Sequence, residues 1–187
     1  MVDIPENIFK AYDIRGIVGK TLTVGIVREI GRAIGSEALA RKQSTVVVGR
    51  DGRLSGPEFA QALSDGLRAA GVNVIDIGMV PTPVLYFATH HLKTGSGVAI
   101  TGSHNPPDYN GIKIMLGGET LSGEAISALR TRIVEGELSN GAGQWKAVDV
   151  VPDYIARVTS DVRLARPLKI VVDCGNGVPG MLAPRVL

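Results

Sequence analysis

The sequence has 187 residues and 44% hydrophobic content, which is enough for one packed domain and part of another. Twenty basic and eighteen acidic residues leave a formal charge of +2, and no basic stripe with interleaved aromatics indicates a nucleic-acid partner. No apolar stretch approaches the ~18–20 residues that span a bilayer. The single cysteine, Cys174, excludes an internal disulfide, and the N-terminus lacks the apolar core of a signal peptide, so we expect a cytoplasmic protein.

Strand and helix patterns alternate through the first part of the chain. Apolar residues at three- and four-residue spacing predict helices, and short β-branched runs bounded by glycine predict buried strands. In chain order, the sequence predicts a helix over 22–42, a strand over 45–48, a helix over 55–70, a strand over 72–78, a helix over 82–92, strands over 96–102 and 110–116, and a helix over 122–136. This order predicts an α/β fold with a mixed, mainly parallel sheet sandwiched by helices. The short link between the last two strands predicts an antiparallel pair.

The helix predicted from residue 55 carries the signals of a helix N-terminus. Glu58 follows Ser55 by three residues, which is the spacing of a capping box. We therefore expect the Ser55 side chain to cap this helix. Just before it, Asp51 and the glycine that follows are expected to make a turn, with Arg50 and Arg53 bracing neighbouring loops.

A stretch rich in Gly, Ser and Asn interrupts the alternation and predicts a domain boundary. We expect a first domain over 1–140, a linker over 141–152 and the incomplete start of a second, similar α/β domain over 153–187. This last part should contain a helix over 152–165, then a strand over 167–173, a Gly-rich turn braced by the strand's final aspartate, and the beginning of a helix. A lone strand with one helix on each side buries its faces poorly, so the sequence predicts the first part of a longer protein.

The segment TGSHNPPDYNGIKI, residues 101–114, has the clearest chemistry. Ser103 follows a predicted buried strand, and ligands of open α/β sheets bind outside the carboxyl ends of the strands. Gly102 permits a close approach, and the two prolines stiffen the loop. Such residues also occur in turns that bind no ligand. Both interpretations, a loop that presents Ser103 to a ligand and a simple turn, stay open at this point.

Two reaction types compete for this serine. A Ser-His-Asp hydrolase is weakly supported, because its G-x-S-x-G motif requires a glycine where Asn105 stands. His104 directly follows Ser103, and adjacent side chains of an extended chain point in opposite directions, which makes His104 a poor general base. Phosphate chemistry fits better. Lys113 returns toward the loop in the next strand, and Arg15 lies in a polar cluster, so we expect both to stabilise phosphoryl charge.

Four segments together resemble the bacterial phosphomannomutase/phosphoglucomutase branch of the α-D-phosphohexomutases. They are FKAYDIRG, VVVGRDGRLSG, TGSHNPPDYNGIKI and VVDCGNGVPG, and they follow in order over nearly the whole chain. The residues Thr101 and Gly102 before Ser103 favour the hexose branch over phosphoglucosamine mutases. The resemblance implies an isomerase that interconverts hexose 1-phosphate and hexose 6-phosphate, with mannose or glucose as the sugar. The reaction would use a phosphoserine at Ser103 and a hexose 1,6-bisphosphate, which is both intermediate and activator.

The resemblance also implies roles for individual residues. The expected catalytic residues are Ser103, Lys113, Arg15 and His104, and the expected substrate-binding and phosphate-binding residues are Tyr12 and Asn105. Lys113 is preferred for proton transfer, because an arginine remains protonated near neutral pH. One Mg²⁺ would bind an oxygen of the phosphate on Ser103 and three aspartates of a second-domain loop.

That metal loop, with the pattern D-G-D-x-D-R, is absent from this sequence, as are the family's later sugar and phosphate loops. We therefore expect the chain to be inactive alone. Its expected partners are phosphorylated hexoses and the missing C-terminal domains, with no nucleic acid and no membrane. The alternative is a non-catalytic phosphosugar-binding or assembly module of the same fold.

Overall fold

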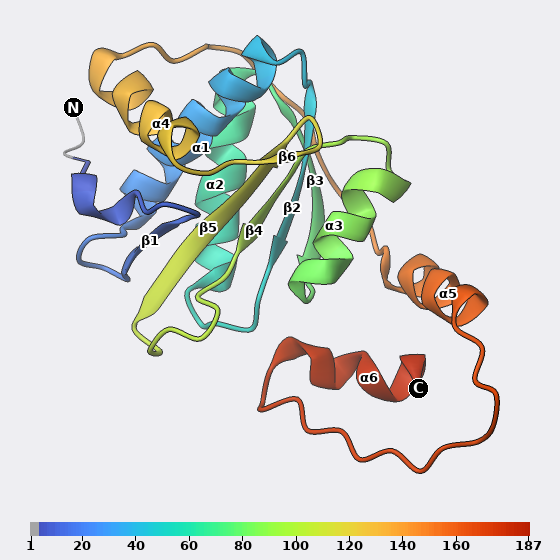
Figure 1. Ribbon diagram of the computed structural model, residues 1–187. Helices are drawn as coiled ribbons and strands as arrows, with labels where there is room; N and C mark the ends of the chain where they lie inside the picture. The colour runs from blue at the N-terminus through green and yellow to red at the C-terminus, as the bar shows by residue number, and fades with distance from the viewer. Residues whose placement is uncertain (1–3) are drawn as a thin grey trace.

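A seven-stranded mixed sheet organises the protein, for which a computed structural model describes residues 4–187 (Figure 1). The strands are β1 Ile14–Ile17, β2 Thr45–Arg50, β3 Asn73–Met79, β4 Gly97–Ile100, β5 Tyr109–Leu116, β6 Glu119–Thr120 and β7 Trp145–Ala147. Their spatial order is β1-β5-β4-β2-β3-β7, and β6 pairs with β5. The strands β4, β2, β3 and β7 are mutually parallel, whereas β5 runs antiparallel to β1, β4 and β6. The predicted mixed sheet and the predicted antiparallel β4–β5 pair are confirmed.

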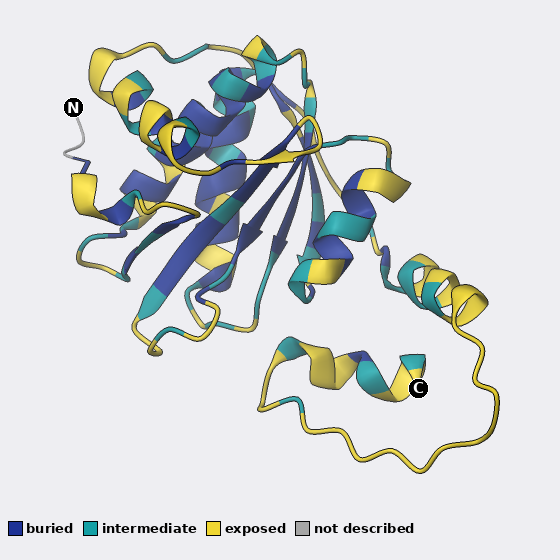
Figure 2. Cartoon of the chain, viewed as in Figure 1, coloured by how far each residue is buried: buried dark blue, intermediate teal, exposed yellow. Residues whose placement is uncertain are grey.

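Helices cover both faces of this sheet, as predicted. They are α1 Val24–Ala40, α2 Gly56–Ala70, α3 Thr82–His91, α4 Glu124–Glu135, α5 Val151–Asp161 and α6 Ala183–Val186, with 3-10 turns η1 Glu6–Ile8 and η2 Val178–Met181. Figure 1 shows α1, α2 and α4 on one side of the sheet and α3 on the other. An apolar core lies on each side, and Figure 2 shows the strands between them as buried. Among the described residues, no helix is both long enough and apolar enough to cross a membrane.

Local signals explain the start of α1 and the end of α2. The Thr23 hydroxyl accepts a hydrogen bond from the Ile26 N–H at 3.3 Å and begins α1, while Gly71 in the left-handed conformation (φ 105°) ends α2. The predicted capping box at Ser55 is wrong. Ser55 itself has helical dihedral angles, so its hydroxyl does not cap α2 and instead accepts a hydrogen bond from Asn110 Nδ2 at 2.8 Å.

The region predicted as a linker takes part in the sheet. Trp145 of β7 pairs with Val74 of β3, and the side chain of Val150 is buried in the core beneath α3. The short strands β1 and β7 escaped prediction because neither has the alternation or the β-branched run that predicts a strand. Helix α5 packs on α3, with the Phe87 and Tyr154 ring centroids 5.4 Å apart. The domain boundary itself stays a prediction.

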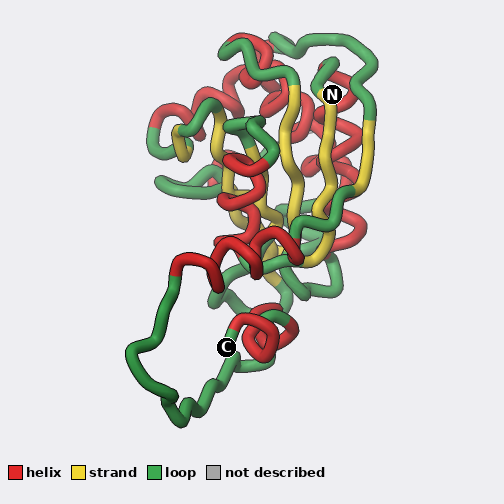
Figure 3. Tube along the Cα trace, turned by 90° about the vertical axis from the view of Figure 1, so that its right-hand side faces the viewer, coloured by secondary structure: helices red, strands yellow, loops and turns green. Residues whose placement is uncertain are grey.

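The strand predicted over 167–173 does not form. These residues lie in an exposed loop that Figures 1 and 3 show extending away from the sheet, and Val171 is 92% exposed. A strand needs a neighbour to pair its N–H and C=O groups, and the described residues supply none here. The turn after it does form, because Asp173 Oδ1 accepts from the Gly175 N–H at 2.8 Å, and short helical turns follow.

Close packing of α1 on α2 depends on glycine, and we predict that Gly66→Ala destabilises the chain. A Cβ at Gly66 would lie 2.1 Å from the Arg28 carbonyl oxygen of α1, so the helices would have to separate. We expect the free energy of unfolding to fall by about 1–3 kcal/mol in urea denaturation. The control is Gly25→Ala on the exposed side of α1, where a Cβ meets nothing and stability should rise by up to about 1 kcal/mol. Equal stability of the two variants would contradict the prediction.

Candidate functional site

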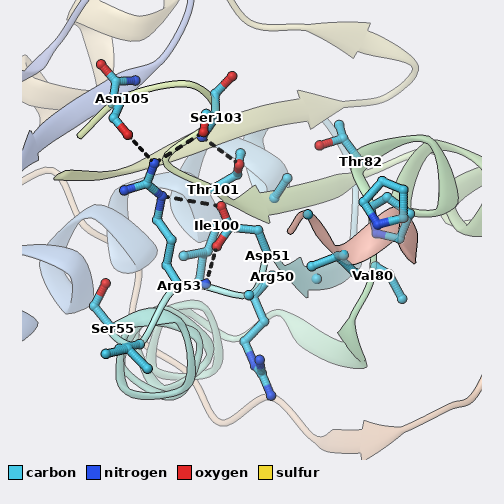
Figure 4. A pocket seen from close by; sticks show the side chains of 18 of the residues that line it. Arg50, Asp51, Arg53, Ser55, Val80, Thr82, Ile100, Thr101, Ser103 and Asn105 are labelled. Carbon is cyan, nitrogen blue, oxygen red and sulfur yellow. Dashed lines mark hydrogen bonds and ion pairs between the residues drawn. The ribbon is translucent and has the colours of Figure 1, made fainter. Parts of the chain in front are cut away.

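A cavity of about 920 Å³ opens at the carboxyl ends of the parallel strands β2, β3 and β4 (Figure 4). Its wall includes the residues that follow these strands, among them Asp51, Val80 and Thr101. Ser55, which precedes α2, and the first residues of α3 also line it, and residues 175–179 of the C-terminal segment contribute to its wall. This is the edge at which open α/β sheets bind ligands.

Ser103 lies exposed at the rim of this cavity in a strained conformation. Its φ is +50°, in the left-handed region, which costs a non-glycine residue roughly 1–3 kcal/mol. The loop holds it there through local hydrogen bonds. The Ser103 N–H donates to Thr101 Oγ1 at 3.0 Å, and Asn105 Nδ2 donates to the Gly102 carbonyl oxygen at 2.8 Å. A strained backbone at a residue with an exposed hydroxyl is typical of functional loops.

The expectation that His104 points away from Ser103 is wrong. Ser103 Oγ lies 3.3 Å from His104 Nδ1. The expectation assumed an extended chain, whereas the left-handed φ of Ser103 brings the two side chains to the same side. Within residues 4–187, no hydrogen bond or ion pair joins His104 to a carboxylate, so the third member of a hydrolase triad is not assembled there.

The predicted cations gather around a buried carboxylate that the sequence reading overlooked. Asp13, only 5% exposed, lies 2.7 Å from Arg15 Nη2 and 3.6 Å from Lys113 Nζ. The antiparallel pairing of β1 with β5 brings these residues together. Arg15 Nη1 also donates to Asn105 Oδ1 at 3.2 Å and so links this cluster to the serine loop. The sequence signal for this carboxylate was the motif AYDIRG, in which Asp13 stands two residues before Arg15.

The remaining predicted residues divide into two groups. Tyr12 is 75% exposed, and none of the described hydrogen bonds joins it to the serine loop. Arg53 braces the serine loop as predicted, by donating to main-chain carbonyls that include that of Asn105 at 2.6 Å. Figure 4 shows Arg50 pointing away from Ser103, and its bracing role stays a prediction.

The described residues do not by themselves fit a complete magnesium site. No group of three His, Cys, Asp or Glu side chains in residues 4–187 could hold a metal ion. Ser103 offers one oxygen, and Asp51 Oδ2 is already occupied by the Gly102 N–H at 2.9 Å.

Comparison with known proteins decides the family. The family model described as phosphoglucomutase/phosphomannomutase, alpha/beta/alpha domain I, matches residues 6–140. The chain belongs to this family. The resemblance seen in the sequence is thereby confirmed, and the matched region contains the serine loop, the cation cluster and the cavity edge of the sheet.

Relatives of this phosphohexomutase-family chain are similar over nearly its whole length. The phosphomannomutase/phosphoglucomutase of Pseudomonas aeruginosa is 56% identical over 184 residues, which are 98% of this chain and 40% of the relative. The phosphoglucomutase of Neisseria meningitidis serogroup B is 50% identical and covers 100% of this chain and 41% of its own length. A crystal structure of a phosphoglucomutase/phosphomannomutase family protein from Burkholderia thailandensis superposes with a TM-score of 0.94 at 53% identity, over 98% of this chain and 42% of that one. The chain thus spans about two fifths of these relatives.

Asp13 should be the main electrostatic support of the cation cluster, and we predict that Asp13→Ala destabilises the chain. Removing the carboxylate leaves Arg15 and Lys113 adjacent without their shared counter-ion. Because both cations are about a third exposed, water offsets part of the loss, and we expect about 1–2 kcal/mol in urea denaturation. The control is Asp161→Ala, which removes the exposed ion pair with Arg157 and should change stability by less than about 0.5 kcal/mol. Similar losses in the two variants would show that Asp13 has no special role.

Proposed function

We propose that this chain supplies the phosphoserine-bearing part of a phosphohexomutase that interconverts hexose 1-phosphate and hexose 6-phosphate. The observation that carries the proposal is the position of Ser103, whose hydroxyl is held in a strained loop at the rim of the cavity. Family membership supports it, as does the cluster of Arg15, Asp13 and Lys113, which Arg15 joins to the serine loop through Asn105. The curated relatives are named for mannose and glucose phosphates, and we propose the same substrate class here.

The proposed reaction is a phosphoryl transfer to and from Ser103 Oγ. In the forward half, the bond between the Ser103 oxygen and phosphorus breaks, a sugar hydroxyl bonds to the phosphorus, and the hydroxyl proton passes through a base to the released Ser103 oxygen. The product of this half is hexose 1,6-bisphosphate. In the second half, the bond between the sugar O1 oxygen and its phosphorus breaks, Ser103 Oγ bonds to that phosphorus, and the Ser103 proton passes to the sugar oxygen, so that hexose 6-phosphate leaves. Such transfers depend mainly on positioning and on neutralising phosphoryl charge.

The proposal gives each neighbouring side chain a task. Arg15, held by Asp13 and Asn105, stabilises phosphoryl oxygens with a fixed positive charge. Lys113 moves the proton of the sugar hydroxyl, and His104 contacts the serine oxygen. Tyr12 is proposed to meet the sugar from its exposed position beside the cluster.

Further elements of the proposal lie outside this chain. Mg²⁺ would bind the phosphate on Ser103 and would take its remaining ligands from C-terminal domains, which the greater length of the relatives supports. Those domains would also complete the sugar site, so the chain alone would be inactive. Hexose 1,6-bisphosphate would act as the activator. A cytoplasmic location remains part of the proposal.

The decisive variant is Ser103→Ala in the whole protein. We expect mutase activity to fall at least about 10³-fold, because the group that carries the phosphoryl is removed. Intact mass should show one phosphate on the wild type and none on the variant. The matched control is Ser127→Ala on the exposed face of α4, which should keep both activity and phosphate.

Two outcomes would replace this proposal. Phosphosugar binding with no phosphate on Ser103 and no mutase activity in the whole protein would indicate the non-catalytic module. Labelling of Ser103 by a fluorophosphonate would instead indicate a hydrolase, for which the 3.3 Å contact between Ser103 Oγ and His104 is the only favourable feature among the described residues.

A further inference from the structure

The guanidinium of Arg53 is surrounded by carbonyl oxygens of the serine loop. Arg53 lies just after β2, and its side chain is only 15% exposed. Its two terminal nitrogens make four hydrogen bonds to main-chain oxygens. The acceptors are Pro106 at 2.6 Å and Tyr109 at 2.7 Å for Nη1, and Asn105 at 2.6 Å and Ser103 at 3.2 Å for Nη2. A single side chain therefore fixes both ends of the loop.

Asp51 completes this arrangement from the other side. Its Oδ1 accepts from the Arg53 N–H at 2.9 Å, and its Oδ2 accepts from the Gly102 N–H at 2.9 Å. Asp51 Oδ2 also lies 3.6 Å from Arg53 Nε. The two terminal nitrogens of Arg53 are thus occupied by main-chain oxygens, and Figure 4 shows the guanidinium pointing toward Ser103 and Asn105. Arg53 supports the loop and is not free to bind a phosphorylated sugar.

Gly102, the residue before Ser103, leaves the space that the Arg53 side chain occupies. A Cβ at Gly102 would lie 1.8 Å from Arg53 Nε and 2.0 Å from its Cζ. No side chain other than hydrogen therefore fits at Gly102 while Arg53 occupies its place. This contact explains why a glycine precedes the serine in TGS: its hydrogen leaves room for the arginine that ends GRDGR.

We propose that Arg53 is a positioning residue for phosphoryl transfer, a role that rests on the proposed function. By binding the carbonyls on both sides of Ser103, it holds that residue at φ +50° and so fixes the direction of the Ser103 hydroxyl. The task needs the planar fork of arginine. A lysine keeps the charge but has three donors on one nitrogen and cannot reach four separated carbonyls.

The test uses the whole protein with Arg53→Ala and Arg53→Lys. Misplacement of a reacting group by about 1 Å costs on the order of 10²-fold in rate, so we expect kcat to fall about 100-fold in both variants while KM changes little. Added guanidinium should restore activity to Arg53→Ala, which has space for it, and not to Arg53→Lys. Gly102→Ala should lower kcat without rescue, because the guanidinium is displaced rather than missing.

Arg68→Ala is the matched control. Arg68 also donates from its side chain to a loop carbonyl, that of Gly143 at 3.0 Å, but lies on α2 away from the cavity. This variant should keep wild-type kcat and should not respond to guanidinium. If Arg53→Lys keeps wild-type kcat, or if guanidinium rescues Arg53→Lys as well as Arg53→Ala, the positioning role is overturned. Arg53→Lys decides the question even if Arg53→Ala does not fold.

A second readout separates this inference from the proposed function. Hydrogen exchange of the amides in residues 101–109 should become faster in both Arg53 variants and stay unchanged in Arg68→Ala. If the wild type carries no phosphate on Ser103, the proposed function fails, and hydrogen exchange still reports whether Arg53 holds the loop. If the wild type is an active phosphoenzyme and the Arg53 variants show normal exchange and normal kcat, only the Arg53 inference fails.

Discussion

The carbonyl oxygens of the loop between β4 and β5 need hydrogen-bond donors, and the geometry of the site depends on how that need is met. The loop reverses the chain between antiparallel strands and holds Ser103 in a left-handed conformation. The donors come from Arg53, which stands at the end of the neighbouring strand β2. Asp51 accepts a hydrogen bond from the Gly102 N–H of the loop. Arg53 thus binds loop carbonyl oxygens, and Asp51 binds a loop N–H group. A strained, exposed serine is stable because residues of the turn that follows β2 hold its loop.

A second set of contacts, centred on the Asp13 carboxylate, holds two cations near one another and joins one of them to the loop. Arg15 on β1 and Lys113 on β5 both lie within 3.6 Å of the same Asp13 oxygen, and their positive charges would repel each other without this counter-ion. Asp13 supplies it from a nearly buried position, while Asn105 links Arg15 to the loop. The serine loop is thus held by two sets of contacts. Arg53 binds its main chain, and Arg15 of the cation cluster binds the Asn105 side chain.

The C-terminal segment shows what happens when contacts from distant parts of the chain are missing. Residues 167–173 have the β-branched run of a buried strand, yet they stay in an exposed loop. A strand is stable only when neighbours pair its backbone and cover its side chains, and the described residues provide neither. The turn at Asp173 forms nevertheless, because its hydrogen bond to Gly175 is local. In this segment the hydrogen bond between neighbouring residues forms, whereas the strand, which needs a second strand to pair with, does not form.

The sequence by itself determined the alternation of strands and helices from α1 to β5, the following helix α4, the antiparallel β4–β5 pair and the serine loop, because periodicity, turn residues and a specific motif are all encoded locally. It also determined the family, through four segments in a fixed order. Only the tertiary structure decided that Asp13 joins the two cations, that Ser103 faces His104, and that Ser55 bonds Asn110 rather than capping α2. Each of these depends on a register between strands or on a left-handed dihedral angle, and neither can be obtained from residue spacing along the chain.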